Sequence, residues 1–131
     1  ESLINRLGLA ERIRFVGNAT HEDINRLYAE SAVAVVPSLY EGFGLPIVEA
    51  LLSKTPVLCS NTAAMPEAAG PDSWYFDPVE EEDILQCLEL FFKHTNDHEK
   101  RIQKGYEYAM QHFAPQRIAQ QWLQQYRSLM R

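Results

Sequence analysis

The chain has 131 residues, of which 46% are hydrophobic, and its formal net charge is −6 at pH 7. This length and apolar content suit one domain with one buried core, and the acidic balance excludes a basic surface for nucleic acid. No apolar stretch approaches the ~20 residues of a membrane span and no signal peptide is present, so we expect a cytoplasmic protein.

The chain opens with a short helix and a strand. Apolar residues at helical spacing predict a helix over residues 2–9, and the run of apolar residues at 13–16 predicts a strand that ends at Gly17. Thr20 and Asp23 form a capping-box pattern. The following helix, residues 21–30, is predicted to cross over into the next strand.

The most informative stretch is 33–51, in which a strand, a glycine-bearing loop and a helix follow without a gap. The β-branched run at 33–36 is typical of a strand buried on both faces of a parallel sheet. Gly42 and Gly44 flank Phe43, and glycines this close allow a tight turn that brings bare N–H groups up to a ligand.

The start of the helix after this loop is a candidate anion site. Pro46 suits the first helical turn but has no N–H to offer. Helix N-termini carry unpaired N–H groups and a partial positive charge. We therefore expect the amides of Gly44, Leu45 and Ile47 to hold a phosphate or sugar oxygen.

Two carboxylates frame this loop, and seven residues separate Glu41 from Glu49. Carboxylates accept hydrogen bonds from hydroxyls, so the pair around an anion-binding turn suits a nucleotide sugar. The spacing alone leaves an alternative open, in which Glu49 stabilises the helix N-terminus through the dipole and Glu41 is merely solvated.

The rest of the chain continues the alternation of strands and helices and ends in a helical tail. Strands are predicted at 57–60 and 74–76, with a short helix between them, and helices begin near Glu80, Asn96 and Pro115. Cys59 and Cys87 show no metal-ligand spacing, so we expect buried, reduced thiols. We also expect part of the apolar face of the last helix, at Ile118, Trp122 and Tyr126, to be exposed or to pack on a neighbouring chain.

The segment PSLYEGFGLPIVEAL resembles the EX7E region of the retaining GT-B glycosyltransferases of family 4, also called group 1. Glu41 and Glu49 match the two glutamates of that motif. The resemblance implies that Glu49 contacts the donor ribose, that Glu41 is the catalytic residue, and that Gly17 is a candidate near the base, although a simple turn glycine is the stronger interpretation. It implies donor sugar and diphosphate contacts for Glu41, Gly42, Phe43, Gly44 and Leu45.

The resemblance implies an α/β fold, namely a Rossmann-like part of a GT-B C-terminal domain with about four parallel strands, flanking helices and a helical tail. Residues 1–131 are then a donor-binding half-domain. It lacks the first two strands, their basic diphosphate loop and the N-terminal acceptor domain. The implied function is transfer of a sugar from a nucleotide diphosphate sugar to an acceptor hydroxyl with retention. No metal or cofactor is expected, and the isolated chain is expected to be inactive.

Two other functions stay open, a non-catalytic nucleotide-sugar binding or interaction module and a GT-B nucleotide-sugar epimerase. Peripheral membrane association of a full-length protein also stays open. If strand 13–16 lacks its family neighbours, its open edge recruits a partner. We expect it to close onto strand 33–36 in a four-stranded sheet, with self-association through this edge or through the last helix as the alternative.

Overall fold

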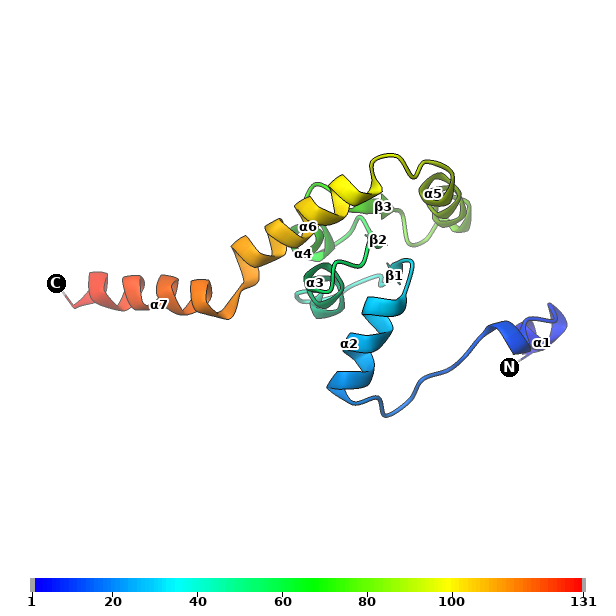
Figure 1. Ribbon diagram of the computed structural model, residues 1–131, viewed down its shortest axis with the longest axis horizontal. Helices are drawn as coiled ribbons and strands as arrows, with labels where there is room; N and C mark the ends of the chain where they lie inside the picture. Colours follow the sequence, from blue (N-terminus) through cyan, green and yellow to red (C-terminus); the bar gives the residue numbers. More distant parts are fainter. Residues whose placement is uncertain (1, 131) are drawn as a thin grey trace.

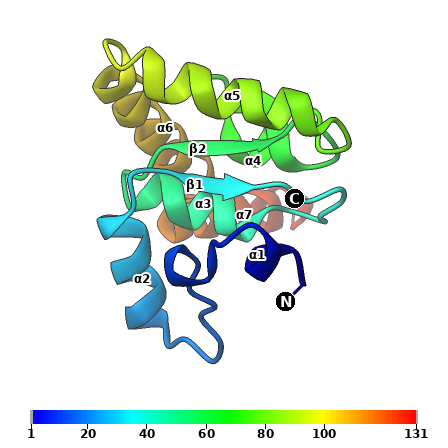
Figure 2. The ribbon, with the colours of Figure 1, turned by 90° about the vertical axis from the view of Figure 1, so that its right-hand side faces the viewer.

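The computed structural model describes residues 2–130 and has a three-stranded parallel sheet at its centre (Figures 1 and 2). The strands follow sequence order and are β1 (Ala34–Val36), β2 (Val57–Ser60) and β3 (Trp74–Phe76). In the register, Val35 lies opposite Leu58, and Leu58 lies opposite Trp74. The predicted α/β class with a parallel sheet is confirmed.

The helices lie close to where the sequence predicts them. They are α1 (Ser2–Arg6), η1 (Ala10–Arg12, a 3-10 turn), α2 (His21–Glu30), α3 (Leu45–Leu52), α4 (Met65–Ala69), α5 (Glu81–Lys93), α6 (His98–Phe113) and α7 (Pro115–Leu129). The capping box is present, because the Thr20 hydroxyl accepts from the Asp23 amide while the Asp23 carboxylate accepts from the Thr20 amide. These bonds fix the start of α2.

The core lies on both faces of β2, which is buried along its whole length. Val57 and Cys59 belong to an apolar cluster with α3, α4 and α6, whereas Leu58 belongs to a second cluster with α5. Figure 2 shows α5 on one side of the strands and α3 on the other. Alternating side chains therefore bury opposite faces, which is why a continuous apolar run forms the central strand.

β1 is an edge strand, and full burial of this run is not observed. Val35 retains 39% exposure, because no strand pairs with the outer side of β1 among residues 2–130. The apolar runs of β1 and β2 match the same sequence pattern. Only β2 is buried along its whole length, because it has a strand on each side.

The predicted strand at 13–16 is wrong, and so is the predicted four-stranded sheet. These residues lie in an extended segment away from the sheet (Figure 1), and Phe15 is 82% exposed. A strand needs a neighbour to satisfy its backbone hydrogen bonds. Among the described residues this segment pairs with neither β1 nor any other strand.

α7 projects from the body of the molecule (Figure 1) and has no buried residue. The break before it follows from Pro115, which forces Ala114 into an extended conformation with ψ 130°. Trp122 is 59% exposed, so the predicted exposure of this face is confirmed. Over residues 2–130, no helix is long and apolar enough to cross a membrane.

Candidate functional site

The glycine-bearing loop lies at the carboxyl end of β1 and leads directly into α3. The loop after β2 lies against it, because the Thr62 hydroxyl donates to the carbonyl of Leu39 at 3.3 Å. Ligands of open parallel sheets bind outside the carboxyl ends of the strands. The predicted site therefore has the position that this architecture favours.

Gly44 is the residue that makes the turn into α3 possible. It adopts the left-handed conformation, with φ 87° and ψ 45°, as the N-cap of that helix. A Cβ atom placed there would lie 3.1 Å from Cβ of Ala68. Gly42 has neither restriction, since a Cβ there would meet no atom within 4 Å. Of these two loop glycines, only Gly44 is required by the fold itself.

The turn leaves a short row of backbone amides without protein partners. Within residues 2–130, the N–H groups of Phe43, Gly44 and Leu45 donate to no protein acceptor. Ile47 differs from the sequence prediction, because its amide donates to the Gly44 carbonyl at 3.0 Å. The candidate anion site is therefore shifted toward the loop and does not include the amide of Ile47.

Glu41 is half-buried and is held by a neighbouring hydroxyl. The Ser38 Oγ donates to its Oε1 at 2.8 Å. This bond fixes one carboxylate oxygen across the turn and leaves the other without a protein donor among the described residues.

Glu49 is exposed on α3, and its carboxylate faces α2. The Tyr28 hydroxyl donates to its Oε2 at 3.4 Å. Burial, followed by the charge of Glu49, raises the pKa of Tyr28, so this phenol remains a donor.

Among residues 2–130, neither motif carboxylate pairs with a cation. In the described part of the chain, the ion pairs join Arg26 with Asp23 and Lys104 with Asp72. Neutral hydroxyls, rather than basic side chains, therefore hold Glu41 and Glu49. A carboxylate held in this way keeps its remaining acceptor capacity for a ligand.

The loop also depends on residues that the sequence did not single out. The Phe43 ring packs edge-on against Phe113 of α6, with ring centroids 5.4 Å apart. Ser38 and Tyr28 were missed as well, although Ser38 follows the strand directly and could have been recognised as a partner for a carboxylate three residues later. Gly17 lies in the exposed N-terminal segment, and the structure does not bring it to the loop.

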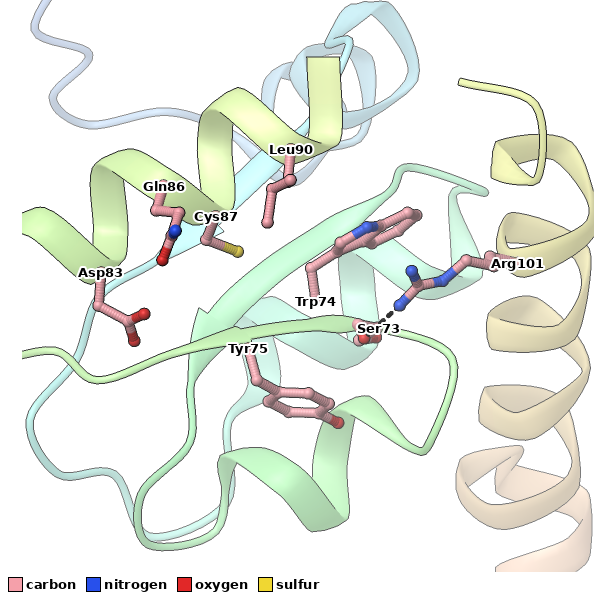
Figure 3. A pocket seen from close by; sticks show the side chains of 8 residues that line it. All are labelled: Ser73, Trp74, Tyr75, Asp83, Gln86, Cys87, Leu90 and Arg101. Atoms are coloured by element: carbon pink, nitrogen blue, oxygen red, sulfur yellow. Dashed lines mark hydrogen bonds between the residues drawn. The ribbon is translucent and has the colours of Figure 1, made fainter. Parts of the chain in front are cut away.

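A different hollow lies at the β3 edge, between α5 and α6 (Figure 3), with a volume of about 210 Å³. Its polar groups are already engaged. Arg101 donates to the carbonyls of Asp72 at 2.9 Å and Ser73 at 2.7 Å, and its guanidinium carbon lies 3.7 Å from the Trp74 ring centroid. Asp83 accepts from a backbone amide. This hollow joins α6 to β3 and offers little to a ligand.

The cysteines and potential metal ligands add no further site. Cys59 and Cys87 are free, buried thiols, as predicted, and burial raises the pKa of Cys59 from 9.0 to about 12. Within residues 2–130, no group of three or more His, Cys, Asp or Glu side chains is arranged to hold a metal ion. Metal independence stays a prediction.

Comparison with known families decides what kind of protein has this arrangement. The model of the family described as "Glycosyl transferases group 1" matches residues 1–108. The chain belongs to the group 1 glycosyltransferases. Its predicted family is therefore confirmed, and its fold is that of a GT-B C-terminal domain.

This group 1 chain is similar to several named enzymes. It is 44% identical to the MMP alpha-(1->4)-mannosyltransferase of Mycolicibacterium hassiacum over 72 residues, which cover 55% of the chain and 18% of that enzyme. It is 30% identical to the mannosylfructose-phosphate synthase of Agrobacterium fabrum over 122 residues, which cover 92% of the chain and 27% of that enzyme.

A solved structure supports the arrangement of the whole chain. Sucrose-phosphate synthase from Thermosynechococcus elongatus superposes with a TM-score of 0.87 and 28% identity, over 98% of the chain and 33% of that protein. A match this complete includes nearly all of the N-terminal segment. The group 1 chain spans a third or less of the relatives described here.

Proposed function

We propose that this group 1 chain supplies the donor-binding part of an enzyme that transfers a sugar from a nucleotide diphosphate sugar to an acceptor hydroxyl with retention. One observation carries the proposal, namely that within residues 2–130 backbone amides without a protein acceptor lie, in sequence, between two carboxylates that form no ion pair. The amides suit phosphate or sugar oxygens, and the carboxylates suit hydroxyls.

The roles follow from the order of groups along the loop. The amides of Phe43, Gly44 and Leu45 hold the diphosphate and the sugar, and Glu41 binds a sugar hydroxyl next to the reacting carbon. Glu49, further along α3, accepts from the ribose. The N-terminal end of α3 favours the negative charge that grows on the leaving diphosphate.

The reaction exchanges one bond at the anomeric carbon for another. The bond to the diphosphate oxygen breaks, and the acceptor oxygen forms a new bond on the same face while its proton passes to the departing diphosphate oxygen. The nucleoside diphosphate is the second product. Two carboxylates repel a diphosphate, so basic side chains from another part of the full-length enzyme must complete the site, and we expect the isolated chain to have no turnover.

The test is made in the full-length protein that contains this chain. We expect Glu41→Ala and Glu49→Ala each to lower transfer by about tenfold to over a hundredfold, because a hydrogen bond to a charged acceptor contributes roughly 1.5 to 3 kcal/mol. Folding should be nearly unchanged, since neither side chain belongs to the core clusters.

Glu89→Ala on α5 is the matched control, because Glu89 is exposed and α5 lies on the opposite side of the strands from α3 (Figure 2). The anomeric configuration of the product, measured by NMR, tests retention. Equal activity of both motif variants and the parent at limiting donor would overturn the proposal. Release of an epimerised sugar without acceptor would replace it with the epimerase.

A further inference from the structure

The Tyr28 side chain joins α2 to the loop helix α3. Its hydroxyl donates to Oε2 of Glu49 at 3.4 Å, across 21 positions of sequence. Within residues 2–130 this is the only protein hydrogen bond to the Glu49 carboxylate. Oε1 accepts from no protein donor among these residues and is therefore the oxygen more fully available to a ligand.

The position of Tyr28 is itself fixed from two sides. Its ring packs against the core cluster of α3, β2 and α4. Its carbonyl accepts from the Thr55 hydroxyl at 2.8 Å, and Thr55 is only 3% exposed. A second bond reaches the same carbonyl from the Ser31 amide at 3.1 Å. The phenol is therefore a rigid donor rather than a mobile surface group.

Glu49, in contrast, is exposed and has three rotatable bonds. An unrestrained carboxylate on a helix surface loses rotamer freedom when it binds a ligand. A fixed phenol that holds one oxygen removes part of that loss before the ligand arrives.

We propose that Tyr28 is a positioning residue that orients the Glu49 carboxylate toward the vicinal hydroxyls of the donor ribose. This inference rests on the proposed function, because it takes Glu49 as the ribose contact. Tyr28 does not touch the ligand. It determines how well the site distinguishes a ribonucleotide from a deoxyribonucleotide.

The experiment uses Tyr28→Phe in the full-length protein, with nucleoside diphosphates as probes. The tightest binder among UDP, GDP and ADP is identified by calorimetry, and its affinity is compared with those of its 2′-deoxy and 3′-deoxy analogues. We expect Tyr28→Phe to lower the ratio of the affinities for the ribonucleotide and its deoxy analogue by about threefold to tenfold, which is the effect of weakening one hydrogen bond to the ribose. Affinity for a deoxy analogue should change less than twofold.

Tyr75→Phe is the control for a purely structural effect. It also removes a tyrosine hydroxyl bond, the one to the Gly70 carbonyl. It should lower thermal stability and leave the preference for the ribonucleotide unchanged. In a Glu49→Ala background, Tyr28→Phe should have no further effect on this preference.

The two proposals fail in different ways. If Glu49→Ala leaves the preference intact, or if none of the three diphosphates binds, the ribose assignment and the proposed donor site are overturned together. If Glu49→Ala removes the preference and Tyr28→Phe does not reduce it, only the positioning role of Tyr28 is overturned.

Discussion

Replacement of Gly44 by alanine tests whether the loop has the left-handed turn seen here. The φ of 87° places a non-glycine residue in a region that costs about 1 to 2 kcal/mol. The new Cβ would also lie 3.1 Å from Cβ of Ala68, a contact that costs roughly a further 0.5 to 1 kcal/mol. We expect a total loss of about 1.5 to 3 kcal/mol of the free energy of unfolding.

The assay is urea denaturation followed by circular dichroism, with unchanged m-values as the check on two-state behaviour. Gly42→Ala is the matched control and should change stability by less than about 0.5 kcal/mol, because its Cβ meets no atom and its φ is not left-handed. Equal stability of the Gly42 and Gly44 variants would refute the assigned turn.

Three further predictions concern the rest of the molecule. Arg101→Lys should cost about 2 to 4 kcal/mol in urea denaturation, because lysine cannot make both carbonyl bonds and stack on Trp74; a loss below 0.5 kcal/mol would contradict this. Burial raises the pKa of Cys59 from 9.0 to about 12. The buried neutral thiol therefore contributes fully to the free energy of unfolding below about pH 9, and this contribution is lost between pH 9 and pH 12, by up to about 1.4 kcal/mol per pH unit. Denaturation at rising pH with reductant should show a shallower decline for Cys59→Ala than for the parent. Trp122→Ser should reduce self-association in sedimentation without lowering thermal stability, since Trp122 is 59% exposed.

The local chemistry of the loop could be predicted from the sequence because it depends on near neighbours. The order of strand, glycine loop and helix is visible in residues 33–51, and the structure has β1, the turn and α3 in that order. The sequence could not show which glycine lacks room for a Cβ atom, because this depends on Ala68, which lies 24 positions away in sequence.

Long-range partners explain the remaining differences. Residues 13–16 have the composition of a strand, but the chain offers no neighbour that pairs with them among the described residues. The hydroxyl bond from Tyr28 to Glu49 depends on how α2 packs against α3. Neither outcome can be derived from local propensity or periodicity.

A crystal structure of the full-length protein with a nucleotide diphosphate sugar tests the central claim most directly. We expect phosphate or sugar oxygens within hydrogen-bond distance of the amides of Phe43, Gly44 and Leu45, with the ribose hydroxyls at Glu49. A donor bound elsewhere, for example in the hollow between β3, α5 and α6, with these amides and Glu49 facing only solvent, would contradict the account.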